Sequence, residues 1–118
     1  MVTPIPKRLD PQAPVPDGRT PAITLTIFQT FEHAEVPERM REAAESWSEL
    51  NPAFTYRFFD AEDRRSFIED NFDARTLEAY DRIEGGAFRA DFWRYCVLIV
   101  HGGVYADVDS ICAVDLLE

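Results

Sequence analysis

The segment Gly85–Asp109, GGAFRADFWRYCVLIVHGGVYADVD, decides how this chain folds. Its first part predicts an apolar helix over Ala87–Val100. The glycines at 102–103 allow a sharp turn without steric cost, and Val104–Ala106 then indicates a short buried strand. The Asp-Val-Asp triplet follows this strand directly. The segment therefore predicts an α/β fold in which carboxylates stand at the end of a strand.

The acidic triplet is the first candidate site. Asp107 and Asp109 lie at the carboxyl end of the predicted strand, where ligands collect in open α/β sheets. One or two carboxylates, together with phosphate oxygens and waters, are typical ligands of Mg²⁺ or Mn²⁺. A divalent ion held there would in turn bind the phosphate groups of a ligand. Two acids near a strand end are also common on solvated surfaces, so the pair alone leaves both interpretations open.

The second candidate site is the pair Asp91 and Arg94, three residues apart on one face of the predicted helix. Arginine offers a planar fork to phosphate or sugar oxygens, and an aspartate accepts hydrogen bonds from sugar hydroxyls. The alternative is a structural ion pair. Most of the neighbouring helix residues are apolar. Burying a charge in such an environment costs free energy unless the charge is paired or binds a ligand. We therefore interpret the pair as part of a ligand site.

The order of these motifs resembles that of the DXD-containing sugar transferases, glycosyltransferase family 32. This family includes fungal initiating mannosyltransferases, capsular-polysaccharide transferases and, more distantly, glucosylating bacterial toxins. Its pattern is an Ala-Asp-x-x-Arg-Tyr helix followed by Gly-Gly-x-Tyr-x-Asp-x-Asp. With upstream counterparts, the resemblance covers about residues 23–115. The matching motif positions are Ala90, Asp91, Arg94, Tyr95, Gly102, Gly103, Tyr105, Asp107 and Asp109.

The resemblance implies a GT-A fold, a Rossmann-like α/β sandwich, and sugar transfer with retention from a UDP- or GDP-sugar. It implies that Asp107 and Asp109 bind a divalent metal, Mn²⁺ or Mg²⁺. Phe31 stands where the family usually has a Trp near the base, and Phe28 where a His is frequent. No catalytic residue is implied, and the acceptor, a glycan, lipid or protein, stays open. The implied donor-binding residues are Asp91, Arg94, Tyr105, Asp107, Gln29 and Phe31.

Composition limits the other classes of function. The chain has 118 residues, 46% of them apolar, enough for one modest core. Its net charge of −10 argues against nucleic acid or an anionic membrane as partner. No apolar run reaches the length of a membrane span, and the first residues lack a signal-peptide core, so we expect a cytoplasmic protein. Cys96 and Cys112 are expected to be buried and free, with a disulfide as the minor alternative.

Six prolines within residues 1–22 predict a flexible tail or linker there. Residues 23–118 then form a donor-binding domain that ends soon after the Asp-x-Asp strand. Because family domains continue well beyond that strand, we expect a longer enzyme or a completing chain or oligomer. The alternative is a non-catalytic fragment or degenerate module that binds nucleotide sugars but lacks the acceptor half.

The sequence between the tail and the motif helix predicts two parallel strands joined by a right-handed helical crossover, followed by two more helices. The strands are expected over residues 23–28 and 54–59, and the helices over 37–50, 61–71 and 74–83.

Overall fold

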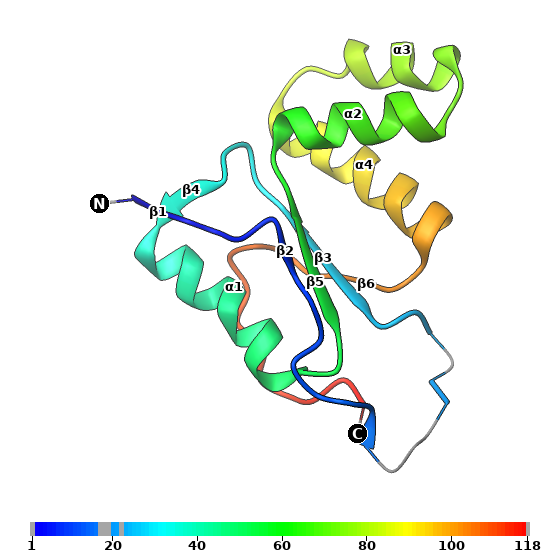
Figure 1. The fold of residues 1–118 in the computed structure, drawn as a ribbon. Helices are drawn as coiled ribbons and strands as arrows, with labels where there is room; N and C mark the ends of the chain where they lie inside the picture. Colours follow the sequence, from blue (N-terminus) through cyan, green and yellow to red (C-terminus); the bar gives the residue numbers. More distant parts are fainter. Residues whose placement is uncertain (1, 17–19, 22, 118) are drawn as a thin grey trace.

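A computed structural model describes residues 2–16, 20–21 and 23–117. It shows a four-stranded sheet with one helix packed on one face and three helices on the other (Figure 1). The mixed α/β fold class is therefore confirmed. In sheet order, the strands are β2 (Arg8–Leu9), β5 (Thr55–Phe59), β3 (Thr26–Thr30) and β6 (Val104–Tyr105).

The two predicted strands, β3 and β5, pair in parallel from Thr26 opposite Thr55 to Thr30 opposite Phe59. The short strand after the glycine turn, β6, pairs in parallel with β3 on its other side. Strand β3 begins three residues later than expected and is buried on both faces, as central parallel strands usually are. The period-two alternation expected from Ile23 is thus wrong, because that residue is 48% exposed and precedes the strand.

The four predicted helices are confirmed to within one residue at each end. A capping box starts the second helix: the Asp60 carboxylate accepts a hydrogen bond from the Asp63 amide, and the reverse bond also forms. The last helix ends at Gly102, whose φ of +68° suits a glycine. The helices are α1 (Glu38–Leu50), α2 (Ala61–Asn71), α3 (Ala74–Arg82) and α4 (Gly86–His101).

Two apolar cores lie on opposite faces of the sheet. Ile27 and Tyr56 pack toward α1, whereas Phe28 and Phe59 pack toward α2 and α4 around the fully buried Trp93. Neighbouring residues of one strand therefore pack into different cores, because successive side chains of a strand point to opposite faces of the sheet. This arrangement brings the carboxyl ends of β3, β5 and β6 close to the first turns of α2 and α4 (Figure 1).

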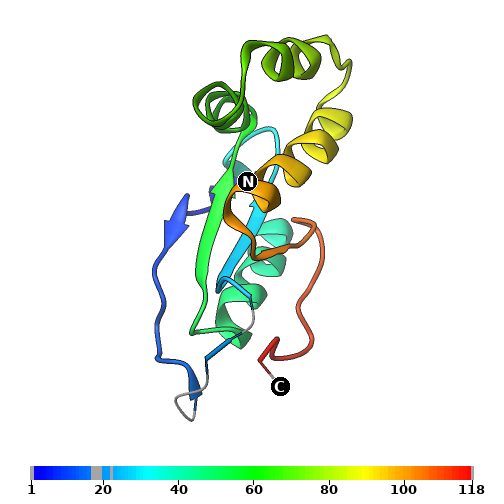
Figure 2. The same cartoon turned by 90° about the vertical axis from the view of Figure 1, so that its right-hand side faces the viewer.

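The N-terminal segment differs from the expected tail. It runs along the outer edge of β5 (Figure 2), where β2 pairs antiparallel with β5. Strand β1 (Val2–Pro4) pairs with β4 (Glu35–Pro37), and Ile5 is buried in the first core. Prolines are tolerated here because proline has no backbone N–H to donate, and on an edge strand some backbone N–H groups face away from the sheet. Residues 1, 17–19 and 22 of the predicted linker lie outside the described residues.

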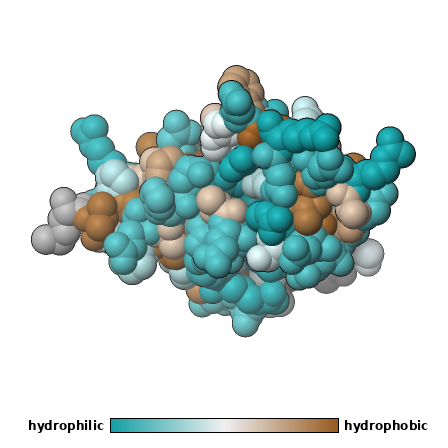
Figure 3. All heavy atoms as spheres, turned by 90° about the horizontal axis from the view of Figure 1, so that it is seen from above, coloured by the Kyte–Doolittle hydropathy of each residue, from teal (hydrophilic) through white to brown (hydrophobic). Residues whose placement is uncertain are grey.

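Other expectations concern thiols, membranes and charge. Cys96 and Cys112 are both buried and free, as predicted. Among the described residues, no helix combines the length and hydropathy that a bilayer crossing requires. Seen from above, over α2 and α3, the surface is mostly hydrophilic with separate hydrophobic spots (Figure 3).

Candidate functional site

A cavity of about 360 Å³ lies at the carboxyl ends of β3 and β6, beside the first turns of α4. A larger hollow of about 540 Å³ beside Arg57 and His101 contains none of the predicted site residues. The smaller cavity stands where an α/β sheet is expected to bind its ligand. Five of the seven predicted residues line it: Phe31, Asp91, Tyr105, Asp107 and Asp109.

The acidic pair combines exposed carboxylates with a fixed backbone. Asp107 and Asp109 are exposed on either side of the buried Val108. The Asp107 carbonyl accepts hydrogen bonds from the Gln29 side chain at 3.0 Å and from the amide and hydroxyl of Ser110. The strand end is therefore held from two directions while the side chains of both aspartates stay exposed.

The charges that line the cavity favour a cation. Four carboxylates, those of Glu32, Asp91, Asp107 and Asp109, face one guanidinium, that of Arg64. Within the described residues, no three His, Cys, Asp or Glu side chains are grouped closely enough to hold an ion by themselves. A metal here would take its other ligands from phosphate oxygens and water, as Mg²⁺ usually does. The residues present fit such an open site.

Gln29 has an indirect place in this site. Its side chain is fully buried and does not line the cavity. Its Nε2 donates to the Asp107 carbonyl, and its Oε1 accepts from the Tyr56 hydroxyl at 2.8 Å. Gln29 was predicted to contact the donor directly. In the structure it instead supports the segment that carries Asp107.

Asp91 and Arg94 form the ion pair that was the alternative interpretation, with 3.8 Å between carboxylate and guanidinium. Their side chains are 59% and 34% exposed, so the assumption of an apolar environment was wrong. The outer face of α4 is open to solvent, with Tyr95 62% and Ile99 76% exposed. Asp91 nevertheless lines the cavity, so the pair borders the site without being locked inside the fold.

Tyr105 joins this pair to the acidic strand end. The Arg94 guanidinium lies over its ring at 5.5 Å, although Arg94 itself does not line the cavity. Burial, reinforced by the Asp107 charge, raises the pKa of Tyr105 to about 12. The phenol therefore stays neutral at physiological pH and forms an amphipathic wall.

The two phenylalanines behave differently. Phe31 is half-buried at the cavity and packs partly against the first core. Phe28 is 1% exposed and fixed in the second core, with the His101 ring stacked 6.0 Å away. Only Phe31 is placed to meet a ligand.

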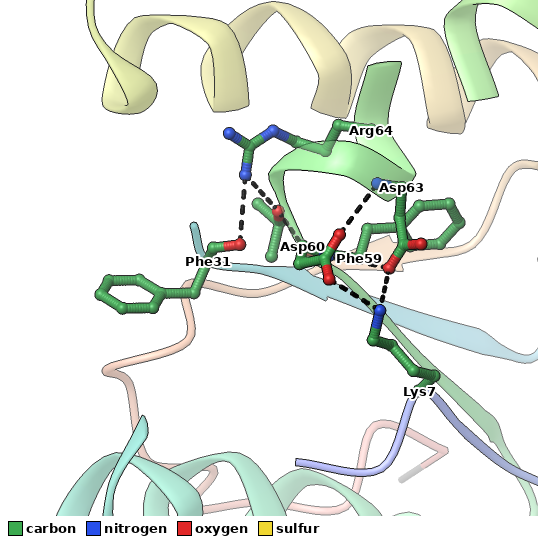
Figure 4. Close-up of polar contacts among 7 residues, drawn as sticks. Lys7, Phe31, Phe59, Asp60, Asp63 and Arg64 are labelled. Atoms are coloured by element: carbon green, nitrogen blue, oxygen red, sulfur yellow. Dashed lines mark hydrogen bonds and ion pairs between the residues drawn. The ribbon is translucent and has the colours of Figure 1, made fainter. Parts of the chain in front are cut away.

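Among the cavity-lining residues that the sequence did not mark as site residues are Glu32, Arg64 and Gly86. The Arg64 guanidinium is fully buried and donates to Thr30 Oγ1 and to the Phe31 carbonyl at the end of β3 (Figure 4). An arginine in the first turns of a helix usually lies on the surface, so nothing local marked it.

Comparisons with known proteins identify relatives of this chain. Residues 37–118 match the family described as the glycosyltransferase sugar-binding region containing a DXD motif. An uncharacterised glycosyltransferase of Acanthamoeba polyphaga mimivirus is 36% identical over 84 residues, which cover 71% of this chain and 34% of that protein. Inositol phosphoceramide mannosyltransferase 2 of Schizosaccharomyces pombe is 38% identical over 92 residues, covering 78% and 26%.

A third relative is the putative glycosyltransferase HOC1 of Saccharomyces cerevisiae, 33% identical over 86 residues that cover 71% of this chain and 22% of that protein. The chain thus spans between about a fifth and a third of the length of these relatives. No solved structure matches it.

Proposed function

The chain belongs to the family of glycosyltransferase sugar-binding regions that contain a DXD motif, and we propose that it forms the donor-binding part of a metal-dependent glycosyltransferase. The observation that carries the proposal is the cavity at the carboxyl ends of β3 and β6, where two exposed carboxylates stand on a fixed strand end. The family match over residues 37–118 and the similar proteins confirm the resemblance made from the motifs, whereas the metal, the donor and the stereochemistry belong to the proposal.

In this proposal Asp107 and Asp109 hold a divalent ion, Mn²⁺ or Mg²⁺, together with the diphosphate of the donor. When bound, the ion supplies positive charge to the nucleoside diphosphate as it leaves. The acidic lining of the cavity supports this role, because it would otherwise repel a diphosphate. The Gln29 and Ser110 hydrogen bonds to the Asp107 carbonyl keep the strand end in place while the carboxylates bind.

The remaining residues orient the donor. Asp91 accepts hydrogen bonds from sugar hydroxyls, Arg94 donates to sugar or phosphate oxygens, and Tyr105 covers one side of the sugar. Phe31 lies under the nucleotide base. The bond from the anomeric carbon to the diphosphate breaks, a new bond to the acceptor hydroxyl oxygen forms with retention, and the hydroxyl proton is released along with the nucleoside diphosphate. Because relatives are named mannosyltransferases, GDP-mannose is the first donor to test, with UDP-glucose beside it.

Titration calorimetry tests this function. We expect wild-type protein to bind at least one of the two donors in the presence of Mn²⁺ and to lose the binding on addition of a chelator. The variant Asp109→Asn should bind at least about tenfold more weakly with an unchanged circular dichroism spectrum, because its side chain is exposed.

The matched control is Asp70→Asn, an exposed carboxylate near the end of α2 that is remote from the cavity. It makes the same change in charge and should leave donor affinity unchanged. Metal-independent binding, or the same loss in both variants, would refute the role of the acidic pair. Absence of binding by any UDP- or GDP-sugar would refute the function.

A further inference from the structure

One buried arginine, Arg64, makes hydrogen bonds to three consecutive residues of the segment that carries Phe31. Arg64 Nη1 donates to Thr30 Oγ1 at 2.7 Å and to the Phe31 carbonyl at 3.4 Å, and Nη2 pairs with the Glu32 carboxylate. Three consecutive residues at the carboxyl end of β3 are thus tied to the second turn of α2. From the other side, Nε donates to the Tyr80 hydroxyl of α3 at 3.4 Å.

Glu32 is also confined from the side of α4. A methyl group at Gly86 would collide with the Glu32 carboxyl group, so the carboxylate occupies the space that this glycine leaves open. Gly86 is the first residue of a sixteen-residue helix, whose N-terminal end favours a nearby negative charge. The carboxylate therefore fits between the guanidinium on α2 and the start of α4.

Charge keeps this arrangement together. The Arg64 side chain is 0% exposed, and within the described residues Glu32 is the carboxylate that pairs with it. A buried cation without a partner is strongly unfavourable, so the pair resists separation. Although burial opposes it, hydrogen bonding to Tyr80 and Glu32 raises the pKa of Arg64, which stays charged. Glu32 remains 42% exposed at the cavity.

We infer that Arg64 is a positioning residue of the donor site, acting through Glu32 and the Phe31 carbonyl to hold the Phe31 ring where the nucleotide base binds. The inference rests on the function proposed above. It differs from a purely structural role in one respect: it predicts that binding of the base depends on Arg64 more than binding of the diphosphate, because the Asp107 strand end is held separately by Gln29.

Two probes distinguish these contacts. Mn²⁺-pyrophosphate contains the metal and the diphosphate but no base, whereas Mn²⁺-GDP and Mn²⁺-UDP contain all three. Arg64→Lys keeps the charge but cannot reach four acceptors from one planar group. By calorimetry we expect about tenfold weaker binding of the nucleotide that the wild type prefers, a typical stacking contribution, and unchanged binding of Mn²⁺-pyrophosphate.

Gly86→Ala perturbs the same segment without replacing Arg64 itself. Its methyl group should push the flexible end of Glu32 away from Arg64, with the same selective loss of nucleotide affinity. This variant keeps the inference testable if Arg64→Lys fails to fold. The matched control is Arg65→Lys, which changes the neighbouring, half-exposed arginine that pairs with Asp81 of α3. It should bind both probes like the wild type.

Equal losses for nucleotide and pyrophosphate in Arg64→Lys and Gly86→Ala would mean a general structural defect and would overturn the inference. Wild-type affinity of the folded variants for both probes would overturn it as well. In either case wild-type protein still binds the nucleotide, so the proposed function stands. Wild-type protein that binds neither probe would instead refute the function, and the inference with it.

Discussion

Gln29 offers a direct test of how the acidic strand end is held. Its carboxamide is fully buried, accepts from the Tyr56 hydroxyl at 2.8 Å and donates to the Asp107 carbonyl at 3.0 Å. Gln29→Met keeps the length of the side chain but leaves the Tyr56 hydroxyl buried without its partner, which costs about 1–3 kcal/mol. The Asp107 carbonyl retains the Ser110 amide and hydroxyl, so it adds little to this loss.

For a domain of this size, about 1–3 kcal/mol corresponds to a drop in melting temperature of roughly 4–12 °C. Tyr56→Phe should cost a similar amount, because it leaves Gln29 Oε1 unpaired inside the fold. The double variant removes both partners of one hydrogen bond. Its loss should therefore be smaller than the sum of the two single losses by about 1 kcal/mol or more.

Urea unfolding followed by circular dichroism measures these free energies of unfolding. Tyr95→Phe is the matched control, because the Tyr95 side chain is 62% exposed, and it should lie within about 0.5 kcal/mol of the wild type. Strictly additive losses in the double variant would refute the coupling between Gln29 and Tyr56. Gln29→Met with wild-type stability would refute a stabilising role for the hydrogen bond between Gln29 and Tyr56.

Three further outcomes follow from charge and backbone geometry. Although burial opposes it, Lys7 and the Asp63 amide hold the pKa of Asp60 below its ordinary value (Figure 4). The ionised Asp60 therefore contributes stability above its unfolded pKa of about 4, which is lost as the pH falls through the folded value. Thermal melts of Asp60→Asn should show a smaller acid-induced loss than the wild type, and parallel curves would contradict this. Gly103→Ala places a methyl group 2.6 Å from the Thr26 carbonyl at a φ of +96° and should cost at least about 1–3 kcal/mol in urea unfolding. Gly85→Ala is the control, because it has the same φ but its nearest contact is 3.5 Å away, so it should lose less stability. An equal loss in both variants would mean that the close approach to Thr26 does not contribute. Arg94→Lys removes a half-exposed guanidinium and should change stability by less than about 1 kcal/mol, yet weaken donor binding in calorimetry. Unchanged donor affinity would rule out the role proposed for Arg94.

The sequence alone determined the features that depend on residues close together along the chain. The hydrophobic pattern set the bounds of α1 to α4 to within one residue, and two glycines marked the turn before β6. The Asp-x-Asp pair was placed at a strand end because the turn, the strand and the acids are consecutive. These predictions succeed because local backbone preferences and the hydrophobic pattern act within a few residues.

The tertiary structure alone decided which distant residues meet. Gln29 turns inward because its partners lie on both sides of β3: Tyr56 is on β5, and the Asp107 carbonyl follows β6. Arg64 is buried because the end of β3 supplies enough acceptors for its guanidinium. The proline-rich N-terminal segment, including the buried Ile5, packs on the fold through partners far along the chain. A buried polar or charged group is stable only when its hydrogen bonds are satisfied, and those partners exist only once the chain has folded.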